Sequence, residues 1–250
     1  AVAGGLAGMV LGNLRLPLAV SMADTVSAGG GANAAVSGVA ALTAAVAHIR
    51  AGRVNWRLFA WLAPPSLVGG FAGGLIANAV SGDVLLYAIA AVLLYGAWEL
   101  FRWRPPPDTA ASSSRPGGEP PPIGLTAARD RLVVTAIGLG VGLLGGAVGL
   151  ILGSLRLPAL LRFTAEQPRL LVGTNLAAGV LVGVAGAIGH LTSGKHGFDV
   201  ALFVIGAISS APGAWLGARL TGRLSTESLV RAIAVIVLIV AVAMITEAVS

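Results

Sequence analysis

The sequence predicts an all-α fold: a polytopic transmembrane helical bundle of about eight segments, built from two homologous halves with broken helices. Three observations predict it, namely an apolar composition, a proline-rich segment in the middle and an internal repeat. Of the 250 residues, 56% are hydrophobic and only 10% are charged, and the mean hydropathy is +0.89. A soluble domain carries about 25% charged residues. So much apolar surface needs lipid as its solvent.

The transmembrane segments are predicted from apolar stretches, since about 20 helical residues cross the hydrocarbon core. The stretches are 1–22, 31–50, 56–80, 83–103, 131–161, 168–192, 198–221 and 228–249. The 36 glycines suit helices whose backbones approach closely. The stretch before Gly145 is longer than the one before Gly4, so the first helix is expected to be truncated in this chain.

A segment rich in proline, serine and charge interrupts the apolar pattern from Arg104 to about Asp130 and contains seven of the 13 prolines. This composition predicts a flexible linker outside the membrane. We therefore expect a first transmembrane repeat at 1–103, a linker at 104–130 and a second repeat at 131–250.

The two halves resemble each other. GGLAGMVLGNLRLPL, from Gly4 to Leu18, aligns with GGAVGLILGSLRLPA, from Gly145 to Ala159, and nine of the 15 positions are identical. Further matches follow in the same order: Asn33 with Asn175, His48 with His190, and Gly69-x-Phe71-x-Gly73 with Gly213-x-Trp215-x-Gly217. Collinear matches over so much of each half indicate an internal duplication, as in many transporter folds.

Basic residues bear on topology, because they mark cytoplasmic loops. Arginines concentrate at 50–57 and in or beside the linker, so both regions are predicted to be cytoplasmic. Four crossings per half would make the halves parallel and place Arg219 and Arg223 outside. If the first segment of each half enters and returns, the halves are inverted, and Arg219, Arg223 and Arg231 move inside. The charge bias favours the inverted arrangement and the hydropathy count favours the parallel one.

The first candidate site is the glycine-rich stretch that ends in Leu-Arg-Leu-Pro in both halves. Pro17 and Pro158, with Gly12 and Gly153 before them, are predicted to break their helices. A helix broken inside a membrane turns free N–H groups toward a cavity, where an anion can bind them. The alternative is that these glycines serve helix packing alone.

Arg15 and Arg156 lie within these stretches, directly after Asn13-Leu14 and Ser154-Leu155. An arginine at membrane depth normally signals function, and its planar fork suits sulfite, sulfonate or carboxylate oxygens. On an ideal helix, however, Arg156 would lie roughly 37 Å from Arg131, at the opposite interface, where arginines extend to water. A re-entrant segment would restore the functional interpretation. Asn13 and Ser154 complete this candidate substrate-binding set.

Asn33 and Asn175 are the next pair, and Thr174 adds a hydroxyl beside the second. Amides at equivalent points of two repeats could line a site between the repeats, or they could serve as helix caps and interhelical hydrogen bonds. His48 and His190, at the ends of their helices, are interpreted as interfacial residues.

Several classes of function are disfavoured. The net charge of +6 comes from arginines in short loops, without the basic stripe that nucleic acid needs. The chain has no cysteine and no metal-ligand spacing, so neither a metal nor a cofactor is predicted. An intramembrane enzyme with Ser37 as nucleophile and His48 as base is disfavoured because about 16 Å of helix separates them. We expect no enzyme.

The motifs of each half, taken in their order along the chain, resemble those of the TauE/SafE sulfite exporter family, also called TSUP. In the first half they read GLAGMVLGNLRLPL, GANAAVSGVAAL, AHIRAGRVNW and LVGGFAGG, and in the second GGAVGLILGSLRLPAL, VGTNLAAGVLVGVAGAIGHLTSGKHGFD and APGAWLGARL. The resemblance covers the chain apart from the linker. Two features depart from the family pattern: Arg15 and Arg156 stand where many members carry an apolar residue, and Ala32-Asn33 replaces Thr-Asn or Thr-Ser.

The resemblance implies a secondary transporter of sulfite, sulfoacetate or a related small anion in the plasma (inner) membrane, driven by an ion gradient, with a proton or sodium ion as the coupling ion. We expect alternating access around a site between the repeats, where the two Leu-Arg-Leu-Pro breaks and the two asparagines meet. An anion channel and a scaffold without transport activity are the alternatives.

Overall fold

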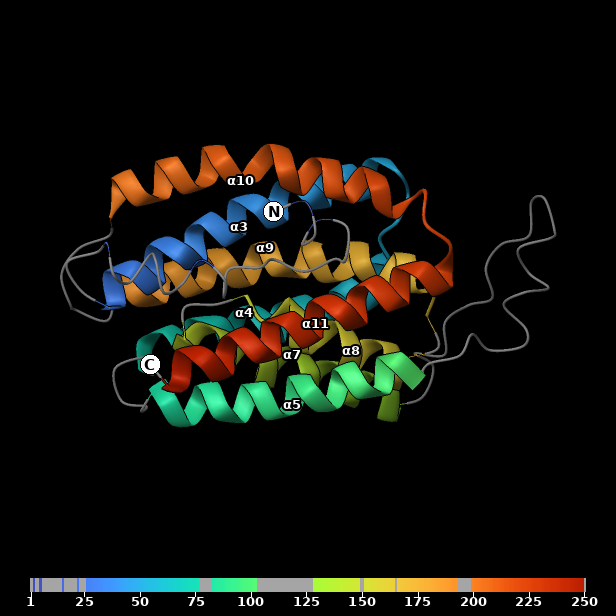
Figure 1. The fold of residues 1–250 in the computed structure, drawn as a ribbon, viewed down its shortest axis with the longest axis horizontal. Coiled ribbons are helices and arrows are strands. Elements are labelled where there is room, and N and C mark those ends of the chain that lie inside the picture. The colour runs from blue at the N-terminus through green and yellow to red at the C-terminus, as the bar shows by residue number, and fades with distance from the viewer. Residues whose placement is uncertain are drawn as a thin grey trace.

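A computed structural model describes residues 2, 5, 15, 22, 26–76, 82–102, 128–148, 151–164, 166–192 and 199–249. These residues form a bundle of helices (Figure 1). The helices are α3 (Val26–Arg50), α4 (Trp56–Ile76), α5 (Gly82–Arg102), α7 (Ala128–Val148), α8 (Gly153–Phe163), α9 (Pro168–Thr192), α10 (Val200–Thr221) and α11 (Thr226–Val249).

Six of the described helices are long and apolar enough to cross a membrane. The spans are Ala28–Arg50, Trp56–Ile76, Ala128–Ala147, Pro168–Gly189, Val200–Thr221 and Thr226–Ala243. The predicted polytopic helical bundle is therefore confirmed. The helix α7 begins at Ala128, slightly before the expected end of the linker.

The apolar stretch 131–161 is not one continuous helix, as its hydropathy suggested. Instead α7 ends at Val148, and the 11-residue helix α8 begins at Gly153 after the non-helical Ile151 and Leu152. The prediction that Pro158 breaks a helix is wrong, because α8 continues through it. Proline removes one hydrogen bond from a helix that is buried along most of its length, so packing compensates for the loss. Pro17 and Gly12 lie outside the described residues.

The equivalent helices α3 and α9 run antiparallel. Gly38 packs against Gly183, whereas Ala41, further along α3, packs against Gly179, which comes earlier in α9. In Figure 1 the two helices lie side by side with their colours advancing in opposite directions. Since these helices occupy the same place in each repeat, the two halves have inverted topology, with a pseudo-two-fold axis in the membrane plane. This resolves the alternatives that hydropathy and charge left open.

The short helix α8 returns through the membrane. Gly138 and Gly146 of α7 lie against Leu62 and Gly70 of α4, so those two helices are parallel. Because α4 in turn runs parallel to α9, with Gly70 at Val182 and Gly74 at Gly189, α7 and α9 cross in the same direction. The intervening α8 must run back toward the end at which α9 begins, and its own N-terminus then lies within the depth of the membrane.

Glycines bring the backbones of α4 and α7 into direct contact. A Cβ atom at Gly146 would lie 2.1 Å from the carbonyl oxygen of Gly70, and one at Gly73 would lie 2.1 Å from that of Leu143. A Cβ atom at Gly5 would likewise lie 2.1 Å from the carbonyl oxygen of Ala214. Gly5 and Gly146 are equivalent in the repeat, so each half packs its first segment on the other half through small residues.

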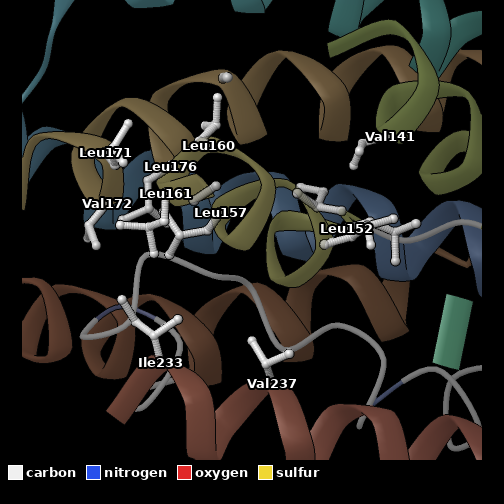
Figure 2. Close-up of a cluster of buried hydrophobic side chains, with 14 of the residues drawn as sticks. Val141, Leu152, Leu157, Leu160, Leu161, Leu171, Val172, Leu176, Ile233 and Val237 are labelled. Atoms are coloured by element: carbon white, nitrogen blue, oxygen red, sulfur yellow. The ribbon is translucent and has the colours of Figure 1, made fainter. Parts of the chain in front are cut away.

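Leucines of α8 form much of the core around the half-helix. Figure 2 shows Leu157, Leu160 and Leu161 of α8 beside Leu171 and Leu176 of α9. From α11, two further apolar residues face the same region: Ile233 and Val237. Packing on several sides orders a helix too short to be stable alone.

The basic side chains of the loops gather at one end of the bundle. There the Nη1 of Arg53, which follows α3, donates to the carbonyl oxygen of Ala218 at 3.2 Å, and Arg169 donates to that of Leu224. Burial and then the charge of Arg169 lower the pKa of Arg53. At the same end Arg219 lies over the ring of Trp215 at 3.4 Å. Arginine and tryptophan together are typical of a membrane interface.

Candidate anion-binding site

Arg156 lies near the start of the half-helix and is 1% exposed, which makes it one of the largest fully buried side chains. Its Nε donates to Oδ1 of Asn175 at 2.6 Å, and its Nη1 makes a longer 3.4 Å contact with Oγ of Ser66. Burial excludes the alternative in which this arginine extends to the interface, because the re-entrant path of α8 keeps it inside the protein.

Asn175 holds both the arginine and the start of α8. Its Oδ1 accepts from Arg156, while its Nδ2 donates to the carbonyl oxygen of Gly153, the first residue of the half-helix, at 3.2 Å. Since an amide has one acceptor side and one donor side, these two bonds together orient it. Asn175 therefore positions the guanidinium relative to the helix N-terminus.

No carboxylate neutralises Arg156 within the described part of the chain, where its hydrogen-bond partners are the neutral Asn175 and Ser66. The positive end of the α8 dipole adds to the same field, since Arg156 lies in the first turns of that helix. A buried cation without an opposite charge is costly unless an anion completes it. The arrangement is suited to binding a small anion.

Arg15 forms an equivalent cluster in the first half. Its Nε donates to Oδ1 of Asn33 at 3.1 Å, its Nη1 to Oγ of Ser210 at 3.0 Å, and its Nη2 to Oγ of Ser37 at 2.9 Å. The arginine is half-buried. Here too these hydrogen-bond partners, in the described part of the chain, are neutral hydroxyl and amide groups.

Each cluster combines residues from both halves. Ser66 and Ser210 are equivalent, because each precedes by three residues the aligned Gly-x-aromatic-x-Gly motif of its half. Arg156 takes its asparagine from its own half and its serine from the other, and Arg15 does the same. The polar clusters therefore lie between the repeats, but they are two clusters with separate partners and do not form the single expected meeting point of both asparagines.

Thr174, adjacent to Asn175, makes its hydrogen bonds outside the arginine cluster. Its hydroxyl donates to the carbonyl oxygen of Leu170 at 2.7 Å and accepts from the backbone N–H of Asn55 at 2.9 Å. Asn55 caps α4 by accepting from Leu58 N–H at 3.0 Å, and its amide also binds the buried Glu166. Thr174 thus holds the loop between α3 and α4 and does not contact Arg156.

Ser154 lies on α8 beside a cavity of about 590 Å³ between α5, α7 and α8. Apart from Ser154 and Arg162, the lining is mostly apolar and includes Ile137, Leu144 and Pro158. Arg156 is not among the lining residues, so this cavity is separate from the arginine cluster. A mostly apolar space of this kind is suited to a hydrocarbon chain.

The structure adds residues that sequence reasoning missed or weighed differently. Ser66 and Ser210 were not singled out, although their equivalent places in the repeat were a usable signal. Ser37 was considered only as a nucleophile. His48 is fully buried, and neither of its ring nitrogens has a hydrogen-bond partner in the described part of the chain, so it is not a water-facing residue. Asn13 and the side chain of His190 lie outside what the structure describes.

Inverted halves and a half-helix that begins inside the bundle are features of transporter folds. A buried arginine with neutral hydrogen-bond partners in the described part of the chain is a candidate contact for a substrate. The family model for "Sulfite exporter TauE/SafE" matches residues 1–244, and the chain belongs to that family. It is also 29% identical over 116 residues to the "Probable membrane transporter protein YunE" of Bacillus subtilis (strain 168). That match spans 45% of this chain and 40% of the relative's length. No solved structure matches significantly.

Proposed function

We propose that the protein is a secondary transporter that moves sulfite, an organosulfonate or a related small anion by alternating access. The observation that carries the proposal is Arg156, which is buried beside the N-terminus of a half-helix with only neutral partners. A guanidinium presents its donors in one plane, which matches two oxygens of a sulfite or sulfonate group. The family name supports this class of substrate, and the name of the related probable membrane transporter supports transport as the activity.

Alternating access follows from the inverted halves. In the structure Arg156 is closed off from both sides, so an anion reaches it only after the surrounding elements part. Because the halves are related by a two-fold axis in the membrane plane, exchanging the conformations of the two halves would open the site to the opposite side. The Gly-packed pair α4 and α7 has its backbones in contact and would move as one rigid unit.

We further propose that the end with Arg53, Arg169 and Arg219 faces the cytoplasm of a cell whose inner membrane holds the protein, together with the linker. The chain has no cysteine, so single cysteines report topology directly. We expect a membrane-impermeant thiol reagent to label Ala51→Cys and Glu227→Cys only in inside-out vesicles, and Val200→Cys only in right-side-out ones. All three positions are exposed. Labelling of Ala51→Cys and Glu227→Cys from opposite sides would contradict the inverted topology.

The test of anion binding is thermal stabilisation of the purified protein by sulfite, sulfoacetate, thiosulfate, sulfate and chloride. At least one sulfur oxyanion should raise the unfolding temperature with a saturable dependence on concentration. Equal and non-saturating effects of all five salts would argue against a specific site.

Adjacent residues of α9 provide a matched comparison. Asn175→Ala should lower the affinity for that anion about tenfold, because Arg156 loses its short hydrogen bond and its orientation. Thr174→Ala should lower the free energy of unfolding by about 1 kcal/mol and leave the affinity unchanged, since its bonds hold the loop between α3 and α4. If both variants bound the anion with equal affinity, Asn175 would not be part of the anion-binding site.

An anion channel is the alternative within the same class. Uptake into liposomes that saturates and shows counterflow would support a carrier, and a large unitary conductance would support a channel. Comparing uptake with and without a proton or sodium gradient would identify the coupling ion. The closed environment of Arg156 favours the carrier, because a channel needs a continuous path.

A further inference from the structure

The two arginine clusters differ at one equivalent position. Ser37 of α3 and Gly179 of α9 each follow the asparagine of their cluster by four residues, and so by one helical turn. Ser37 accepts a hydrogen bond from Nη2 of Arg15 at 2.9 Å. Gly179 offers no hydroxyl, and a Cβ atom built there would lie 3.8 Å from Nη2 of Arg156.

This difference decides which guanidinium nitrogens of each arginine remain available to donate to a ligand. All three nitrogens of Arg15 donate to side chains of the protein. Arg156 donates from Nε and Nη1, and within the described residues its Nη2 makes no hydrogen bond. Buried N–H groups are costly without an acceptor, and an ionised donor more so. In Arg156 the nitrogen without an acceptor among the described residues is Nη2, which faces Gly179.

We propose that the anion binds through Nη2 of Arg156, with one oxygen in the space that the hydroxyl of a serine at position 179 would occupy, and that Gly179 leaves this space open. The inference rests on the proposed transport function and assigns the binding edge within that site. The Arg15 cluster is the closed counterpart, in which Ser37 takes the place of the anion oxygen. The ligand is a small oxyanion such as sulfite or a sulfonate, because one oxygen must reach Nη2 while Nε stays bound to Asn175.

Packing alone would give Gly179 a different role. A Cβ atom at this position would lie 3.3 Å from Cγ2 of Ile151 and 3.7 Å from Cβ of Ala41, so the glycine also lets these neighbours approach. Alanine and serine at position 179 have the same Cβ atom and meet the same neighbours. Only serine adds an oxygen that reaches Nη2. Comparing the two separates a packing role from a binding role.

The experiment measures sulfite affinity by thermal stabilisation of the purified full chain and its variants. We expect Gly179→Ser to bind sulfite at least about tenfold more weakly than Gly179→Ala, because only the serine hydroxyl accepts a hydrogen bond from Nη2. Ser37→Ala should bind sulfite at least as tightly as the parent, because it leaves the partners of Arg156 in place. Equal affinities of the alanine and serine variants at position 179, or a loss in Ser37→Ala as large as in Gly179→Ser, would overturn the inference.

The outcomes also separate this inference from the proposed function. If no sulfur oxyanion stabilises the parent chain, both fail; if sulfite binds and position 179 has no effect, only the inference fails. If Gly179→Ser does not fold, Ser37→Gly decides, because it frees Nη2 of Arg15 in the same way. That variant should bind a second sulfite or bind sulfite at least about threefold more tightly. An unchanged affinity and stoichiometry would count against the binding edge.

Discussion

Replacing Arg156 by glutamine should abolish anion transport and anion-dependent stabilisation while leaving the protein folded. Removing one member of a buried hydrogen-bonded charge pair costs about 3 kcal/mol or more of binding free energy, which is about a hundredfold in affinity. Stability should be unchanged or raised, because the empty protein no longer buries a cation without an opposite charge. The measurements are sulfite uptake into liposomes and the unfolding temperature with and without sulfite.

Arg156→Lys is the matched control for charge. Lysine keeps the positive charge but presents a single ammonium group in place of a planar fork, so it cannot hold Asn175 through Nε and the anion through Nη2 together. We expect binding between that of the parent and that of Arg156→Gln. Full transport in the glutamine variant would refute the assignment of the site to this arginine.

The second large effect is expected at Gly146, in the contact between α7 and α4. Gly146→Leu should destabilise the protein by about 3 kcal/mol or more, because its Cβ atom would lie 2.1 Å from the carbonyl oxygen of Gly70 and the two backbones would have to separate. The measurement is the unfolding temperature in detergent without anion.

Gly140→Leu is the control on the same helix. A Cβ atom at Gly140 meets nothing within 4 Å, and the residue borders the apolar cavity between α5, α7 and α8. Both variants add the same apolar group to α7, so their difference isolates the backbone contact. We expect Gly140→Leu to stay within about 0.5 kcal/mol of the parent. Similar losses in both variants would mean that the glycines matter for reasons other than helix approach.

The location of the site was only partly predictable. Arg15, Arg156, Asn33 and Asn175 follow from the duplication, because equivalent polar residues in two apolar repeats stand out. Ser66 and Ser210 did not stand out, since a single serine in a transmembrane helix normally bonds to its own backbone, as Ser66 does with the carbonyl oxygen of Leu62. That each serine belongs to the arginine of the other half depends on how the halves interlock.

Pro158 shows a limit of local rules. Proline usually ends a helix, but α8 continues through it, and the chain leaves the helical conformation earlier, at Ile151 and Leu152. Burial of α8 among leucines of α9 and apolar residues of α11 outweighs the lost hydrogen bond (Figure 2). Hydropathy could not detect the break, because the residues directly on both sides of it are apolar.

By itself the sequence determined a helical membrane protein with two related halves, since composition requires lipid as solvent and the repeat is visible residue by residue. Only the tertiary structure decided that the halves are inverted and that Arg156 is buried rather than interfacial. Both depend on the return of the short helix α8, which places Arg156 beside Asn175. Hydropathy records how apolar a segment is, whereas the direction in which α8 runs is set by its packing against α5, α7, α9 and α11.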